Sequence, residues 1–227
     1  MSVLTVYAGT ENDSVYSGDS GTYSTMRNGV GLAVESSNLL PFQSDIGGPT
    51  YRGFQGFLRF DTSSLTSAAT ISSSVLNMVC AYGGDASSDH QARIHDFGAT
   101  VTSGDWVAGG TVAGKTLVAH KAVGSLSSST RYDWTDDALA ANTSKTGYTS
   151  LILSEADFAA DVAPTTNHSG SWVKASGGAN DPRLTVTYTM PATGPANLES
   201  LNTNLAANIK SINTNLIANV KSVNTVV

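Results

Sequence analysis

The chain has 227 residues and a formal net charge of −6, with 13% charged residues, 40% apolar residues and 22 glycines. So few charges exclude a long-helical protein and a charged disordered chain. The acidic balance, without any basic cluster, argues against nucleic-acid binding. The length allows one large domain with an appendage.

The first residues and the length of the apolar runs indicate whether the chain carries an export signal or a membrane span. The first residues, MSVLTVYAGTENDS, contain no basic segment followed by an apolar one, so we expect a protein made without an export signal. No run approaches the roughly 20 apolar residues that a membrane span needs, and no membrane partner is expected. The lone Cys80 lies in an apolar run and is predicted to be a buried hydrophobe.

Short apolar runs alternate with spacers rich in Gly, Ser, Thr, Asn and Asp, a pattern typical of an all-β domain. The expected strands are residues 3–8, 14–17, 31–37, 51–65, 73–82, 91–99, 116–123, 131–135, 149–155, 171–176 and 183–189. Their spacing predicts a sandwich or jelly roll. The runs 73–82 and 91–99 are expected to pair as neighbours across the turn GGDASSD. One or two helical turns are expected in TDDALAANTS, with Thr135 as the cap.

The sequence predicts three parts. Residues 1–190 form the β domain, residues 191–197 (PATGPAN) form a linker broken by Pro and Gly, and residues 198–227 form a repetitive tail.

No residue set indicates catalysis, so we expect no enzyme. The string GGTVAGKT (109–116) matches the P-loop pattern, but a strand-like run follows it where a helix is needed. The string GDSG (18–21) matches the nucleophile segment of chymotrypsin-like proteases, but no histidine precedes it. Both matches are interpreted as coincidental.

Metal and ligand signals are weak. The four histidines show no metal-ligand spacing, and no cofactor is expected. Loop carboxylates leave a structural calcium ion open, but no Asp-rich loop identifies its ligands. Trp106 and Trp172 are the candidates for stacking on a glycan; tryptophans beside strand ends more often pack into the core, and that interpretation is favoured.

The phrase FLRFDTSSLTSAATISSSVLNM (57–78) resembles the DNRLRE-type domains, which are similar to the jelly rolls of carbohydrate-binding modules. DPRLTVTY (181–188) resembles their closing strand, and DFGATVTSGDWVAGG (96–110) resembles a strand and loop of phage members. The resemblance covers roughly residues 3–189 and implies a jelly-roll fold. Such domains occur in bacterial surface proteins and in tailed-phage virions, and the missing export signal favours the virion. In the matched phrase, Phe57, Leu58 and Phe60 are expected in the core, and Asp61 is expected to cap the following turn.

The tail repeats with a period of 11 residues, as SLNTNLAANIK (200–210), SINTNLIANVK (211–221) and SVNTVV (222–227). Its apolar residues recur at steps of three and four, and these predicted oligomerisation residues are Leu198, Leu201, Leu205, Ile209, Ile212, Leu216, Val220 and Val223, with Val227 at the end of the same series. Eleven residues in three turns is about 3.67 per turn, which favours a right-handed or nearly straight coiled coil. The simplest assembly is a parallel homotrimer. Intertwined β-strands stay open as the alternative because the segment is rich in Asn and β-branched residues.

Two functions follow from these expectations. The first is a structural protein of a tailed-phage virion, such as a head decoration, head fibre or tail-appendage subunit, with itself and other virion proteins as partners. The alternative is a carbohydrate-binding module that attaches to a glycan on the host surface.

Overall fold

The computed structural model describes residues 1–191 except 48–49, 84–87, 125, 137 and 167–168. The chain divides into two units, residues 1–189 and residues 190–227. The first unit, called the body below, holds every helix and strand that the structure describes.

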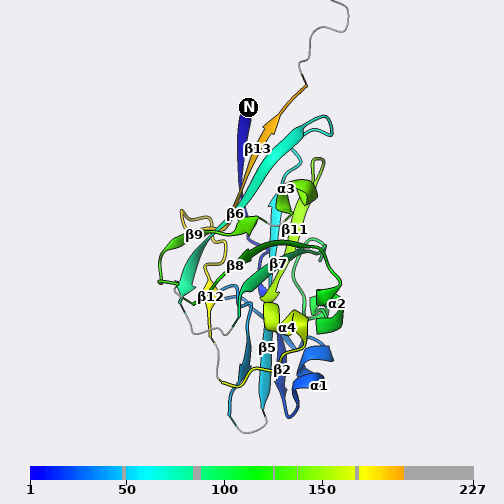
Figure 1. The fold of residues 1–227 in the computed structure, drawn as a ribbon, viewed down its shortest axis with the longest axis vertical. Helices are drawn as coiled ribbons and strands as arrows, with labels where there is room; N and C mark the ends of the chain where they lie inside the picture. Colours follow the sequence, from blue (N-terminus) through cyan, green and yellow to red (C-terminus); the bar gives the residue numbers. More distant parts are fainter. Residues whose placement is uncertain (48–49, 84–87, 125, 137, 167–168, 192–227) are drawn as a thin grey trace, which may run out of the picture. The chain divides into compact units, whose positions relative to one another are not determined.

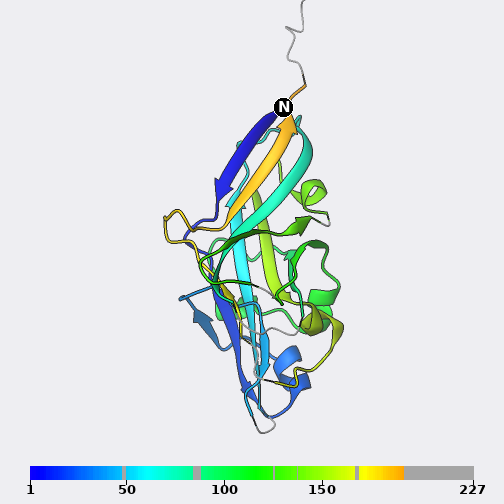
Figure 2. The same cartoon turned by 60° about the vertical axis from the view of Figure 1, so that its left-hand side comes forward.

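The smaller of two antiparallel sheets in the body has five strands in the described residues. In spatial order these are β1 (Ser2–Tyr7), β13 (Arg183–Thr189), β6 (Thr70–Tyr82) and β12 (Ser171–Trp172), with β9 (Arg131–Asp133) also paired to β6. β1, β13 and β6 run side by side as ribbons in Figure 1 and Figure 2.

The larger sheet has eight strands in the described residues. In spatial order these are β10 (Thr135–Asp136), β8 (Leu117–Lys121), β7 (His90–Ile94), β11 (Tyr148–Glu155), β5 (Tyr51–Asp61), β2 (Ser14–Ser20) and β3 (Ala33–Glu35), with β4 (Gln43–Asp45) also paired to β5. The long strands β5 and β11 therefore lie at its centre.

The two sheets pack face to face around the main core, because successive strand residues point to opposite faces. In β5, Leu58 and Phe60 enter this core, whereas Phe57 points to the other face of the sheet. Leu76 of β6 and Leu184 of β13 meet them from the smaller sheet, and none of the five side chains is exposed. Burying each contributes about 1.5–3 kcal/mol. The predicted all-β sandwich is confirmed.

Short helices cover the outer face of the larger sheet. These are α1 (Tyr23–Asn28), η1 (Ser103–Asp105), α2 (Gly109–Ala113) and α4 (Ala156–Ala160). α1, α2 and α4 lie together on one side of the body in Figure 1 and Figure 2, and Met26, Val112 and Phe158 from them pack with Phe57 and Ile152 in a second core. Because both faces of the sheet are covered, the middle of β11 is a continuous apolar run with no polar alternation.

Arg27 fastens α1 to α4. Its Nε donates to the carbonyl oxygen of Phe158 at 2.8 Å, and its Nη2 donates to that of Ala159 at 3.1 Å. Its Nη1 also lies 3.3 Å from the Asp161 carboxylate. The buried guanidinium thereby satisfies carbonyl groups at the end of α4 that have no partner within so short a helix.

Several local predictions are confirmed. β13 spans residues 183–189 as expected, Cys80 is buried, and Phe57, Leu58 and Phe60 are in the cores. The Asp61 carboxylate accepts a hydrogen bond from the backbone N–H of Ser63 at 3.0 Å and so caps the turn after β5.

Two local predictions are wrong. β6 and β7 were expected to pair across their connecting turn, but they belong to different sheets, since both edges of β7 are occupied by β8 and β11. Thr135 does not cap a helix: it lies in β10 and pairs with His120 of β8, and α3 (Leu139–Asn142) begins after Ala138. Sequence proximity favoured the first assignment and the capping preference of Thr favoured the second, and strand pairing overrides both.

In the described part of the chain, no helix has the length and apolar character to cross a membrane.

Candidate functional site

The residues predicted for oligomerisation lie outside the described residues. They are Leu198, Leu201, Leu205, Ile209, Ile212, Leu216, Val220 and Val223.

The two tryptophans named for glycan binding are buried. Trp172 has no exposed surface, and its indole N–H donates to Nδ1 of His90 at 3.0 Å. Trp106 is 8% exposed and packs edge-on against Phe158, with the ring centroids 5.6 Å apart. Neither indole offers an open face on which a sugar could stack, and both belong to the cores, as the favoured interpretation held.

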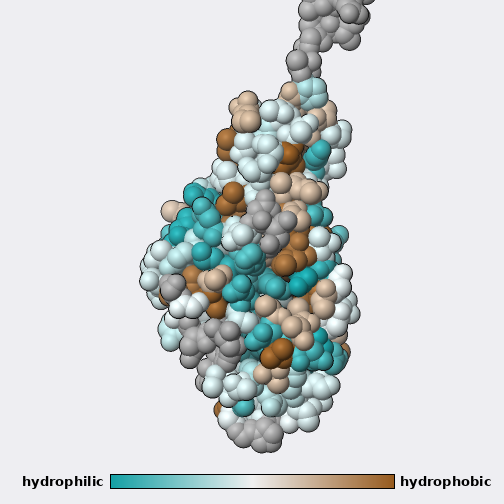
Figure 3. All heavy atoms as spheres, in the orientation of Figure 1, coloured by the Kyte–Doolittle hydropathy of each residue, from teal (hydrophilic) through white to brown (hydrophobic). Residues whose placement is uncertain are grey.

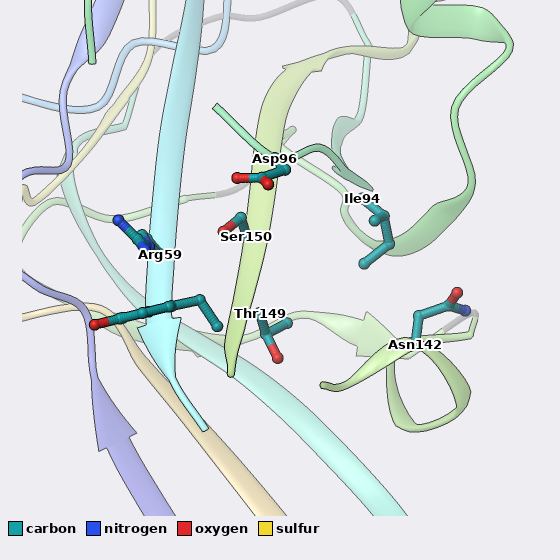
Figure 4. Close-up of a pocket in the computed structure, with 7 residues that line it drawn as sticks. Arg59, Ile94, Asp96, Asn142, Thr149 and Ser150 are labelled. Carbon is teal, nitrogen blue, oxygen red and sulfur yellow. The ribbon is translucent and has the colours of Figure 1, made fainter. Parts of the chain in front are cut away.

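A polar pocket of about 230 Å³ opens at the end of β11 instead. Its walls come from β5, from the last residue of β7 and the loop that follows, from α3 and from the first residues of β11. The lining residues are Arg59, Ile94, Asp96, Asn142, Tyr148, Thr149 and Ser150. Figure 4 shows the Asp96 carboxylate and the Ser150 hydroxyl on the same side of β11 as the Arg59 guanidinium, with Ile94 and Asn142 on the other side.

The pocket exists because β11 extends past the end of β7. Leu151 pairs with Ile94, the last residue of β7, so Tyr148, Thr149 and Ser150 pair with β5 alone. Beyond this point the backbone N–H of His95 still donates to the carbonyl oxygen of Ser150 at 3.0 Å. The β7 side of Tyr148 is consequently an open strand edge.

Two hydrogen bonds define the side of β11 to which the N–H and C=O groups of each residue point along this edge. Gly147 accepts from Thr62 at the end of β5, whereas Ser150 accepts from His95 on the opposite side. Since successive residues of a strand direct their N–H and C=O groups to alternate sides, Tyr148 and Ser150 face the β7 side, and Thr149 faces β5. Tyr148 therefore presents a backbone donor and acceptor to the pocket.

Arg59 holds one wall in place. Its guanidinium carbon lies 3.5 Å from the ring centroid of Tyr148, and its Nη1 donates to the carbonyl oxygen of Gly98 at 2.8 Å. Gly98 has a φ of +82°, which favours glycine, and its N–H donates to Oδ1 of Asp96 at 3.0 Å. The loop after β7 thus folds back over β5 and fixes one carboxylate oxygen of Asp96.

The largest pKa shifts among the described residues belong to buried groups that do not line this pocket. Burial lowers the pKa of His90 to about 3, so the ring is neutral and accepts from Trp172. Burial raises the pKa of Glu155 to about 8, although its Oε2 accepts the backbone N–H of Gln43 at 3.0 Å. His90 and Glu155 are cross-strand neighbours in β7 and β11, and neither lines the pocket.

Among the described residues, no group of three or more His, Cys, Asp or Glu side chains is placed to hold a metal ion. On the face of the body drawn in Figure 3, apolar residues form small patches separated by polar ones.

Comparison of the sequence with protein-family models and with curated proteins finds no match.

The pocket was missed by sequence reasoning. The stretch TSLILSE (149–155) predicted the strand that carries Thr149 and Ser150, which gave part of the signal. No local sequence pattern predicts that Asp96 lies beside Ser150, because this proximity follows from the pairing of β7 with β11. The sequence had instead predicted that residues 91–99 pair with residues 73–82, which form most of β6.

Proposed function

We propose that this chain is a structural protein of a tailed-phage virion that displays a jelly-roll body and assembles through its C-terminal repeat. Head decoration, head fibre and tail appendage are the virion components that such a subunit would serve. Its partners would be copies of itself and other virion proteins.

The placement of the matched phrases supports the jelly-roll part of the proposal. FLRFD forms the end of β5 at the centre of the larger sheet, and RLTVTY forms most of β13 in the smaller sheet. The two phrases therefore supply central core strands to both sheets of an antiparallel sandwich, in agreement with the resemblance to carbohydrate-binding-module-like jelly rolls.

The single observation that carries the assembly is the 11-residue period of residues 198–227. An isolated helix with this narrow apolar stripe and many Asn, Thr and Val residues is marginal in water. Burying each Leu, Ile or Val of the stripe against another copy contributes about 1.5–3 kcal/mol, which offsets that deficit. A parallel homotrimer is the simplest arrangement in which every copy buries the same stripe.

Light scattering after size exclusion tests the assembly on the full chain at about 10 μM, a concentration at which a complex of micromolar affinity would be populated. We expect the mass of a trimer. The double variant Leu205→Asn, Leu216→Asn interrupts the stripe at equivalent positions of two repeats and should run as a monomer. The matched variant Thr203→Asn, Thr214→Asn changes two equivalent positions off the stripe and should keep the trimer.

A monomeric full chain would contradict the assembly. Equal masses for the two double variants would show that the stripe does not carry it.

A further inference from the structure

We propose that β1 pairs in antiparallel fashion with β1 of a second copy of the chain, so that the smaller sheets of two bodies join into one continuous sheet. A two-fold axis relates the two copies, and each contributes the same surface. This contact goes beyond the assembly through the C-terminal repeat, and it does not depend on that repeat because every residue involved belongs to the body.

Among the described strands that end a sheet, β1 is the longest. It lies at one end of the smaller sheet, next to β13, and is the outermost ribbon of that sheet in Figure 1 and Figure 2. The strands at the other ends are β12, β3 and β10, which have two, three and two residues. Short strands and charged side chains normally keep sheet edges from pairing, and β3 and β10 also carry an acidic residue each. β1 (SVLTVY) has six residues, no charge and no proline, so it lacks these protections.

The backbone groups of Val3 and Thr5 point to the open edge of β1. The N–H of Ala8, directly after the strand, donates to the carbonyl oxygen of Pro182 on the β13 side at 2.9 Å, and the register between β1 and β13 has no shift. Since successive residues direct their N–H and C=O groups to alternate sides, the even-numbered residues of β1 face β13 and the odd-numbered ones face away from it. A strand added at this edge would therefore find a donor and an acceptor at every second residue.

The side chains of β1 also leave room for another strand. Leu4 and Val6 pack against the main core but stay partly exposed, because no described strand lies beyond them. On the opposite face of the strand, Val3 is 64% exposed and Thr5 is exposed as well. An uncharged strand rich in β-branched residues would cover both sets, since such residues make favourable cross-strand pairs.

The sequence of β1 meets these requirements when it faces itself. At Ala8 the chain begins to pair with Phe60 of β5, so residues 1–7 form the open stretch. An antiparallel pair centred on Leu4 uses the whole stretch and places Val3 opposite Thr5 of the second copy. This register sets residues with outward backbone groups opposite each other, and it keeps the core-facing side chains on one face of the joined sheet. No charged side chains meet, because β1 has none.

One strand pair of this length makes a weak contact. It falls below the roughly 1,200–2,000 Å² of stable interfaces, so we expect two isolated bodies to associate with a Kd of about 100 μM. In an assembly that already holds several copies together, the same contacts act jointly and become stable. Only this last step rests on the proposed assembly, in which every subunit presents the same edge to its neighbours.

Sedimentation velocity tests the contact in the full chain carrying Leu205→Asn and Leu216→Asn, which should lack assembly through the tail. Between about 10 and 500 μM, we expect this chain to pass reversibly from mostly monomer to mostly dimer. Failure of the tail assembly would appear separately, as a monomeric unsubstituted chain at about 10 μM, and would leave this second step unchanged.

Two substitutions at one position, added to the tail-substituted chain, identify the edge. Thr5→Pro removes an N–H that faces the open edge and does not bond to β13, and proline is tolerated on the open side of an edge strand. It should weaken dimerisation at least about tenfold, because each copy loses a hydrogen bond across the contact. The matched variant Thr5→Val keeps the N–H and the β-branched shape and should dimerise as before.

Charge variants in the same chain test the pairing of β1 with itself. One carries Val3→Lys and Thr5→Lys, and the other carries Val3→Glu and Thr5→Glu. Each alone should stay monomeric, because like charges would lie directly opposite each other across the two-fold axis. An equimolar mixture should dimerise again, because each lysine would then face a glutamate. A mixture that stays monomeric would overturn the antiparallel pairing.

Three further results would overturn the proposal. The first is a tail-substituted chain that is still monomeric at 500 μM. The second is a dimer that survives Thr5→Pro in a chain whose amide spectrum remains folded. The third is slow amide exchange of Val3 and Thr5 in the monomer at about 10 μM, which would show that a segment of the same chain covers the edge.

Discussion

The two halves of β11 differ sharply although they are continuous in one strand. Leu151, Ile152 and Leu153 pair with β5 on one side and β7 on the other, and none is exposed. Tyr148 pairs only with β5, and its side chain is 48% exposed. The same strand thus builds the core in one half and a polar pocket in the other.

The difference shows that the lengths of neighbouring strands decide where the body exposes unpaired backbone groups and polar side chains. Where both neighbours are present, every backbone group is paired and the side chains are apolar. Where β7 ends three residues short, a donor, an acceptor and polar side chains remain, supported by a rigid sheet beneath them.

The largest effect is expected from the paired half. Leu151→Ala should lower the free energy of unfolding by about 2–5 kcal/mol, because it leaves a cavity in the main core. Urea unfolding followed by tryptophan fluorescence measures this change. A loss below 1 kcal/mol would show that the core at this strand is loosely packed.

The pH dependence of stability tests the end of the paired half. Glu155 is protonated in the folded state up to about pH 8 but ionises above its ordinary pKa of 4.5 in the unfolded chain. Rising pH therefore favours unfolding, and between pH 6.5 and 8 the unfolding free energy should fall by about 2 kcal/mol.

His90 acts in the opposite direction. Its folded pKa of about 3 lies below its ordinary 6.5, so falling pH favours the unfolded chain below pH 6.5. The two groups oppose each other between pH 4.5 and 6.5, where stability should be nearly flat. Glu155→Gln should remove the decline above pH 6.5, and an unchanged decline in that variant would assign it to other groups.

The smallest effect is expected from the open half. Tyr148→Ala removes the ring beneath Arg59 and should cost about 0.5–1 kcal/mol, the contribution of an exposed cation–π contact. The same urea experiment serves as the matched comparison with Leu151→Ala. A loss as large as that of Leu151→Ala would mean that the two halves are equally structural.

Much of the fold was predictable from local pattern. Alternation and β-branched residues located β13 and β5, and the Asp61 turn followed from its Asp-Thr-Ser-Ser sequence. The short helix expected in TDDALAANTS is present as α3. The helices α1, α2 and α4 on the outer face were missed because five or six residues are too few to show a helical period.

The candidate site was not predictable for a different reason. Asp96 and Ser150 are brought together by pairing between strands that are more than 50 residues apart in the sequence, and the local turn GGDASSD favoured another partner. The glycan candidates Trp106 and Trp172 were chosen by residue type, and residue type does not distinguish an exposed indole from one that hydrogen-bonds inside the core.

Amide hydrogen exchange along β11 in the full chain tests the contrast between its two halves most directly. The Tyr148 amide, which faces the open edge, should exchange at least about a hundredfold faster than those of Leu151 and Leu153, whose exchange requires opening of the sheet. Equal protection of Tyr148 and Leu151 would contradict the account, because it would show that the edge is covered and the pocket closed.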